Sequence, residues 1–172
     1  MQPPRFDPIR ALKTLAAHEV RFVVVGAFAA VVQGYPLPTY DLDVTPERQR
    51  DNVERLVRAL VELNARLRVP APESVAFPID VRMLEGADVW TLLTDAGPLD
   101  LLTTPAGTHG YDDLRRDAVE LELDGVPFVF ASLRDVIRMK EASNRPKDVA
   151  QLPALRQTLE LVREREARDR RR

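Results

Sequence analysis

Two aspartates separated by one residue, Asp41 and Asp43, are the strongest chemical signal in this chain. Side chains of a β-strand alternate between its two faces, so we expect both carboxylates on one face and Leu42 on the other. Carboxylates about 6–7 Å apart along a strand repel each other, and a divalent cation between them would relieve that repulsion. Oxygen ligands suit Mg²⁺, which keeps open positions for phosphate oxygens. The pair therefore predicts a magnesium site.

The segment before the acid pair predicts a place for phosphate. Residues 22–25, Phe-Val-Val-Val, are typical of a buried strand. Gly26 ends it, and residues 27–33 are expected to form a short apolar helix that ends at Gly34. Backbone N–H groups at a helix start that follows a strand and a glycine can face an anion. Two prolines then direct the chain into a second predicted strand, residues 40–44.

A third aspartate, Asp100, lies in the middle of another predicted strand. Residues 89–94 and 99–103 are expected to be strands joined by a turn at residues 95–98. A buried carboxylate costs several kcal/mol without a partner, so Asp100 must reach solvent, pair with a cation or help to bind a metal. Together the three acids could bind two Mg²⁺ ions, one with a nucleoside triphosphate and one beside an attacking hydroxyl.

Helices and one hairpin are expected around these strands. Thr45 and Pro46 have the types preferred at a helix N-cap and first helical position, so a long helix should begin there. Ser132 and Asp135 predict the start of a helix that carries Lys140. The further predicted elements are helices over residues 8–19, 80–84 and from about 147 onward, and a hairpin over 119–131.

Composition sets limits on the class of protein. The chain has 172 residues, 45% hydrophobic and 30% charged, which is ordinary for one water-soluble domain. The absence of cysteine excludes disulfide and thiolate chemistry and suits a reducing cytoplasm. No apolar run approaches the ~18 residues that span a membrane, and the N-terminus lacks a signal-peptide core. We therefore expect a cytoplasmic protein with no membrane partner. A net charge of −2 means that any RNA partner would need a local basic patch.

Four segments, in order along residues 20–155, carry a family resemblance. Gly26-Ala27, Gly34-Tyr-Pro-Leu-Pro-Thr39-Tyr-Asp41-Leu-Asp43 and residues 97–102 resemble the minimal nucleotidyltransferases of the DNA polymerase β-like superfamily. Residues 132–148 resemble the helical tail of the abortive-infection, type IV toxin–antitoxin nucleotidyltransferases. The resemblance implies an α+β fold, with a small mixed sheet flanked by helices. It divides the chain into a core over residues 1–131 and a helical segment over 132–172 packed on it, in one compact domain.

The resemblance also implies a reaction and a role for each matched residue. Asp41 and Asp43 would ligate Mg²⁺ and through it a nucleoside triphosphate, while Asp100 would ligate a second Mg²⁺ and act as the base or orienter of the attacking hydroxyl. The implied nucleotide-binding residues are Gly26, Ala27, Thr39, Lys140 and Asp148. A nucleoside monophosphate would pass to an acceptor with release of pyrophosphate, driven by alignment and charge neutralisation. The implied acceptor is RNA, above all tRNA, and the implied partner is a cognate antitoxin protein.

Two positions depart from the family pattern. Ala27 stands where the family commonly has a glycine or serine, so the backbone N–H remains but no hydroxyl is available. Leu37 stands where the family often has an arginine, two residues before Thr39. Catalysis could therefore be slow, or the acceptor unusual.

Several other interpretations of these residues stay open. The acceptor could be a small hydroxylated molecule such as an aminoglycoside or lincosamide, or a protein side chain. Strand-end Asp-x-Asp pairs also occur in sugar-nucleotide glycosyltransferases, and a degenerate nucleotide-binding module would need no catalysis. Residues 156–172 hold seven arginines and four acids, which predicts either a solvated helix end or an arm for RNA phosphates.

Overall fold

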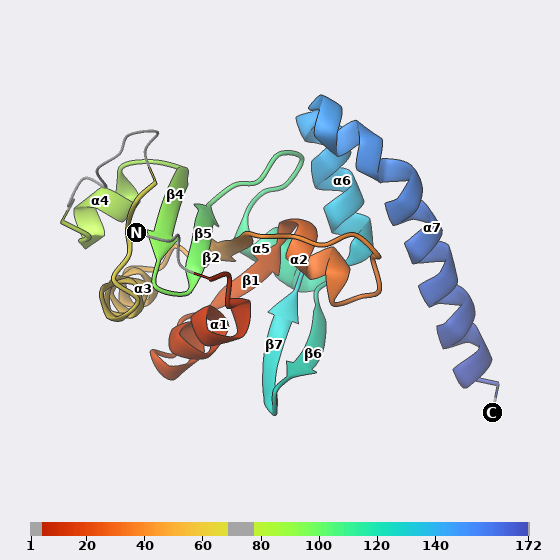
Figure 1. Cartoon of the computed structure of the whole chain (residues 1–172), viewed down its shortest axis with the longest axis horizontal. Helices are drawn as coiled ribbons and strands as arrows, with labels where there is room; N and C mark the ends of the chain where they lie inside the picture. Colours follow the sequence, from red (N-terminus) through yellow and green to blue (C-terminus); the bar gives the residue numbers. More distant parts are fainter. Residues whose placement is uncertain (1–4, 69–77, 172) are drawn as a thin grey trace.

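The computed structural model describes residues 5–68 and 78–171, and these form one mixed sheet with helices around it (Figure 1). The sheet has seven strands in the order β3-β4-β5-β2-β1-β7-β6. The strands are β1 (Phe22–Val25), β2 (Leu42–Pro46), β3 (Arg66–Leu67), β4 (Val89–Thr94), β5 (Gly97–Leu102), β6 (Val119–Leu123) and β7 (Val126–Phe130). The helices are α1 (Pro8–Ala17), α2 (Gly26–Val31), α3 (Arg50–Glu62), α4 (Val81–Glu85), α5 (Tyr111–Arg116), α6 (Leu133–Ser143) and α7 (Pro146–Asp169). The predicted α+β class is confirmed.

The centre of the sheet joins strands that are far apart in sequence. β2 pairs antiparallel with β1 and parallel with β5, and β5 pairs antiparallel with β4. The apolar side chains of Leu42, Val44, Leu92 and Leu99 are fully buried in the core. The polar residues that alternate with them in β2 and β5 must therefore lie on the opposite face of the sheet.

The predicted helix start at Thr45 and Pro46 is wrong. Both residues continue β2, where Thr45 lies opposite Val23 and Pro46 opposite Phe22, and α3 begins only at Arg50. Local helix-start signals are weak compared with a strand ladder, and Thr45 is fully buried within it. The side-chain amide of Asn52 in α3 stabilises the connection between β2 and α3, because its Nδ2 donates to the carbonyl oxygens of Arg21 and Glu47.

Other element boundaries shift by a few residues. β2 begins at Leu42 instead of residue 40, and β5 begins at Gly97, which leaves only Asp95 and Ala96 as the turn from β4. The helix after β1 starts at Gly26 itself. The hairpin of β6 and β7 is confirmed. Ser132 caps α6 as predicted, since its Oγ accepts from the backbone N–H of Asp135 at 3.1 Å.

The last two helices lie together at the end of the molecule opposite α3 and α4 (Figure 1). Asn144 adopts the left-handed conformation that ends α6, and Pro146 opens α7. α6 contacts α2 as well as α7, so it joins α7 to the helix that follows β1. The division into a core and a helical segment at residue 132 stays a prediction.

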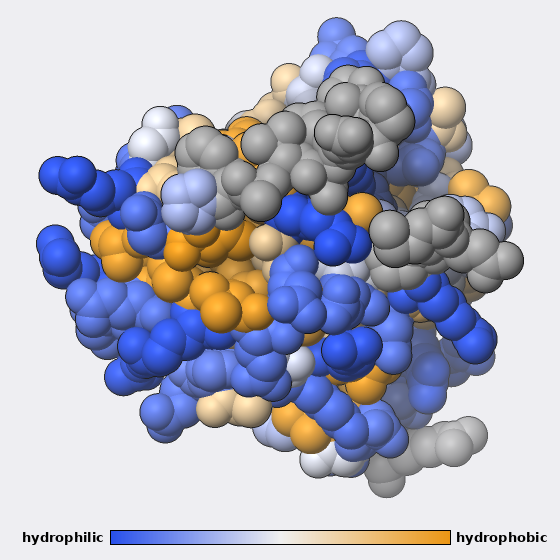
Figure 2. Space-filling model, turned by 60° about the vertical axis from the view of Figure 1, so that its left-hand side comes forward, coloured by the Kyte–Doolittle hydropathy of each residue, from blue (hydrophilic) through white to orange (hydrophobic). Residues whose placement is uncertain are grey.

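Charged and polar side chains cover most of the face drawn in Figure 2, with an apolar area left of its centre. Tyr40 and Val89 are among the exposed large apolar residues. In residues 5–68 and 78–171, no helix combines the length and apolar character needed to cross a bilayer.

Candidate active site

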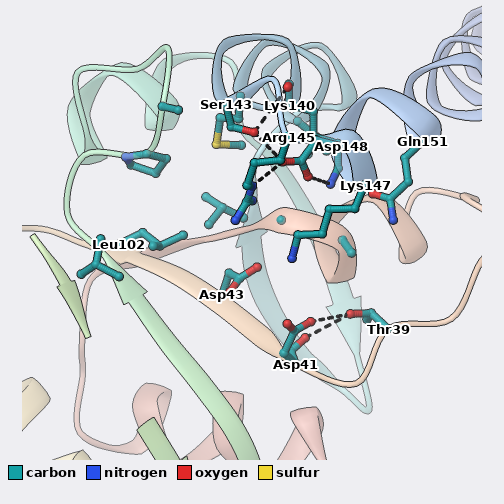
Figure 3. Close-up of a pocket in the computed structure, with 18 of the residues that line it drawn as sticks. Thr39, Asp41, Asp43, Leu102, Lys140, Ser143, Arg145, Lys147, Asp148 and Gln151 are labelled. Carbon is teal, nitrogen blue, oxygen red and sulfur yellow. Dashed lines mark hydrogen bonds and ion pairs between the residues drawn. The ribbon is translucent and has the colours of Figure 1, made fainter. Parts of the chain in front are cut away.

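The strand register brings the predicted acids to one place. Asp43 of β2 lies directly opposite Asp100 of β5, and Asp100 lies opposite Thr91 of β4. Residues opposite each other in a sheet point to the same face, so the two carboxylates are neighbours. Asp41 precedes β2 and accepts a hydrogen bond at its Oδ1 from the hydroxyl of Thr39, 2.7 Å away (Figure 3).

Gly26 is needed because the carboxylate of Asp43 lies against it. A β-carbon added at Gly26 would come within 2.1 Å of Oδ2 of Asp43, so the carboxylate would have to move to make room for it. Gly26 also has a φ of +68°, in the left-handed region that favours glycine. The glycine therefore permits both the turn from β1 into α2 and the close approach of the acid.

The electrostatics of the site disfavour negative charge. Burial raises the pKa of Asp43 to about 7, and repulsion from Asp41 and Asp100 adds to this, although Lys140 and Arg68 oppose it. Burial also raises the pKa of Asp100, with Arg68 acting in the other direction. The three acids thus feel one another's charge, and a bound cation would favour their ionised forms.

The donor set fits Mg²⁺ in kind. Three carboxylates supply the hard oxygen ligands that this ion prefers. A bound cation would also reduce the repulsion between them. Among the described residues, however, no three acidic or histidine side chains stand together in an arrangement ready to hold a metal. Oδ1 of Asp41 accepts a hydrogen bond from Thr39, and both carboxylate oxygens of Asp100 are engaged by Arg68.

A cleft of about 760 Å³ opens over the acids. Its volume is in the usual range for a small-molecule site. It is lined by all the predicted nucleotide-binding residues and by Asp41 and Asp43, but not by Asp100. The predicted residues on its walls are Gly26, Ala27, Thr39, Asp41, Asp43, Lys140 and Asp148.

Lys140 and Asp148 form a buried ion pair. The ammonium of Lys140 lies 3.1 Å from Oδ1 of Asp148, and their side chains are only 13% and 3% exposed. Burial would raise the pKa of Asp148, but hydrogen bonds from Ser143, Arg145 and Lys140 outweigh it and lower the pKa to about 2. Asp148 therefore binds α7 to the end of α6 and fixes the position of Lys140.

Three further polar residues lie on the cleft wall. Lys147 extends from the start of α7 toward Asp43 (Figure 3), and it makes no ion pair within the part of the chain that is described. Gln151, one turn further along α7, has a buried Oε1 without a described hydrogen-bond partner. Arg68, just after β3, pairs with Asp100. Lys147 was visible in the sequence as part of the tail motif, but Gln151 and Arg68 carried no local signal.

The fold is that of nucleotidyltransferases. A candidate nucleotidyltransferase from Thermotoga maritima has 16% identity and a TM-score of 0.51, with 91% of this chain and 96% of that chain covered. The antibiotic-resistance factor ANT(2'')-Ia in solution has 14% identity and a TM-score of 0.54, with 95% and 92% covered. Its crystal structure in complex with adenylyl-2''-tobramycin has 15% identity and a TM-score of 0.55, with 94% and 95% covered. At such identities the likeness concerns the fold. No family model matches the sequence, and no curated protein matches it.

Proposed function

We propose that this protein is a Mg²⁺-dependent nucleotidyltransferase that moves a nucleoside monophosphate from a triphosphate to a hydroxyl group. The observation that carries the proposal is that Asp43 lines a cleft bordered by Gly26 and lies directly opposite Asp100 in the sheet. Bound Mg²⁺ would neutralise charge on the triphosphate and on the attacking oxygen.

The phosphates would lie between the start of α2 and the start of α7. No described side chain caps α2, so the first backbone N–H groups, at Gly26 and Ala27, can donate to phosphate oxygens. Lys147 would supply a cation from the opposite wall. Lys140 would act from a fixed position, since Asp148 already holds it.

The acceptor hydroxyl would attack from the side of Asp100. The oxygen of the acceptor hydroxyl forms a bond to the α-phosphorus. The bond from that phosphorus to the oxygen that bridges the α- and β-phosphates breaks, and pyrophosphate leaves. The hydroxyl proton passes to the carboxylate of Asp100, whose partly buried position favours the protonated form.

The first candidate acceptor is RNA, above all tRNA, in the role of a toxin with a cognate antitoxin. The arginine-rich end of α7 supports this, because the last buried residue of that helix is Thr158 and the helix residues Arg163, Arg165 and Arg168 beyond it are exposed. At 1.5 Å per residue, Arg168 lies about 30 Å along the helix axis from Asp148. An acceptor would have to be large to contact both the cleft and this helix end.

The second candidate acceptor is a small hydroxylated molecule. It is favoured by the shared fold with ANT(2'')-Ia, whose crystal structure contains adenylyl-2''-tobramycin. Such an acceptor would fit within the cleft and would make no contact with the end of α7.

The test is transfer of label from each of the four triphosphates, labelled at the α-phosphate, in Mg²⁺ with total RNA or with a panel of aminoglycosides. Asp43→Asn should abolish transfer, whereas Asp117→Asn, the same change on the surface after α5, should leave it intact. No labelled product with any acceptor, or full transfer by Asp43→Asn, would reject the proposal. Deletion of residues 163–172 should weaken transfer to RNA, most strongly at low salt, and spare transfer to a small molecule.

A further inference from the structure

Arg68 covers the one predicted acid that does not line the cleft. Its Nη2 donates to both carboxylate oxygens of Asp100, at 3.0 and 2.8 Å. Its backbone N–H donates to the carbonyl oxygen of Thr91 at 3.0 Å, and Thr91 lies opposite Asp100 in the sheet. The guanidinium therefore reaches across β4 to Asp100.

This arrangement leaves Arg68, and not Asp100, on the cleft wall. The Asp100 side chain is 14% exposed and that of Arg68 is 38% exposed, so the arginine is the outer member of the pair. An arginine keeps its proton under all ordinary conditions, and both Asp100 oxygens are engaged. In this state Asp100 is poorly placed to accept a proton or to ligate an ion.

We propose that Arg68 is a displaceable counter-ion, which occupies Asp100 in the empty cleft and moves to a phosphate group of the bound nucleotide. The inference rests on the proposed nucleotidyl transfer and concerns its regulation. Asp100 becomes available only when a nucleotide is present, so the acceptor side of the site is completed after the donor side is filled.

The chemistry of the two partners allows such an exchange. A guanidinium forms paired hydrogen bonds with phosphate as readily as with carboxylate. An ion pair whose outer member faces solvent is held only weakly, whereas a triphosphate offers several negative charges in the same cleft. Asp43 and Asp100 would then both face an approaching cation without the competing positive charge.

The test is binding of Mn²⁺, as a probe for Mg²⁺, to the full-length protein without nucleotide, measured by electron paramagnetic resonance. An opposite charge at contact distance changes the proton affinity of a carboxylate by about ten- to a thousandfold, and a partly exposed arginine such as Arg68 belongs at the lower end. We therefore expect Arg68→Gln to bind Mn²⁺ about tenfold more tightly than the wild type. Arg115→Gln, which removes an arginine from an exposed pair with Glu120 on α5 and β6, should change nothing.

A non-hydrolysable triphosphate analogue provides the second measurement. It should strengthen Mn²⁺ binding more in the wild type than in Arg68→Gln, because only the wild type has a counter-ion to displace. Arg68→Lys keeps the charge on a shorter side chain without the guanidinium. Its Mn²⁺ affinity should lie between those of the wild type and Arg68→Gln, and it serves if the glutamine variant does not fold.

The outcomes separate the two proposals. Equal Mn²⁺ affinity in the wild type and Arg68→Gln, with a normal response to the analogue, would overturn the counter-ion role and leave nucleotidyl transfer standing. A lower melting temperature in Arg68→Gln with unchanged Mn²⁺ binding would make the pair merely structural, and would equally overturn it. Failure of every protein to bind Mn²⁺, with or without the analogue, would overturn both.

Discussion

Replacing Asp43 by asparagine should stabilise the protein when no metal is bound. The pKa of this carboxyl rises from 3.8 to about 7 in the folded chain, so its charged form is disfavoured there. At about 1.4 kcal/mol for each pKa unit, the charge destabilises the fold by at most about 4 kcal/mol at pH 8. The amide must still fit beside Gly26, so we expect about half of this gain, which is about 4–8 °C in melting temperature.

The sign of the pH dependence follows from the raised pKa. The folded state binds the proton of Asp43 more tightly than the unfolded state, so the contribution of Asp43 to stability is most favourable below about pH 4. That contribution is lost progressively as the pH rises to about 7, and it is constant above this. The advantage of Asp43→Asn should therefore be small at pH 4 and full at pH 8.

Thermal and urea unfolding in EDTA measure this effect, with Asp117→Asn as the surface control. Mg²⁺ added at pH 8 should raise the melting temperature of the wild type and have little effect on Asp43→Asn. If Asp43→Asn is less stable than the wild type at pH 8 in EDTA, the folded protein does not disfavour the ionised form of Asp43. The electrostatic reasoning would then be wrong.

Four further substitutions probe the walls of the cleft. Lys147→Ala should raise KM for the triphosphate about tenfold in steady-state assays with an unchanged melting temperature, because this side chain reaches into the cleft without an ion pair to a described residue. Lys140→Ala should instead lower the melting temperature, because it leaves the buried Asp148 with one partner fewer. Gly26→Ala should abolish transfer and destabilise the fold by about 1–3 kcal/mol in urea, because its β-carbon would overlap the carboxylate of Asp43. Asp148→Asn should destabilise strongly at pH 7. That loss should vanish as the pH falls from about 4 to about 2, where the wild-type carboxylate is itself protonated.

Each of these has a contrary result. A normal KM in Lys147→Ala with a raised KM in Lys140→Ala would show that Lys140, the lysine predicted from the sequence, makes the phosphate contact instead. An active Gly26→Ala would show that the carboxylate of Asp43 can move away from residue 26 without loss of transfer activity. Equal stability of Asp148→Asn and the wild type at pH 7 would mean that the α6–α7 junction does not depend on the charge of this residue.

The side on which Asp43 lies was predictable because strand periodicity is a local property. Asp41 lies before β2, so the alternation expected to place it on the same face as Asp43 does not reach it. That Asp100 pairs with Asp43 depends on which strands become neighbours and in which register, and neither is written in the residues around Asp100. The family resemblance supplied that link before the structure did.

The two principal misses have a common cause in tertiary structure. Thr45 and Pro46 have the sequence of a helix start, but the ladder with β1 extends β2 through both of them. Arg68 follows a two-residue strand at the sheet edge, and its partner is reached across β4. Pairings of this kind arise from packing, so no short window of sequence could have shown them.

The position of β5 also affects chains that are cut short. β5 fills the place between β4 and β2, so without it β2 presents unpaired N–H and C=O groups along an apolar strand. Unpaired strand edges recruit other chains, and parallel pairs form late because the loop between them must close first. Chains that end before Gly97 should therefore aggregate, and a soluble inactive fragment of this kind is not expected to accumulate.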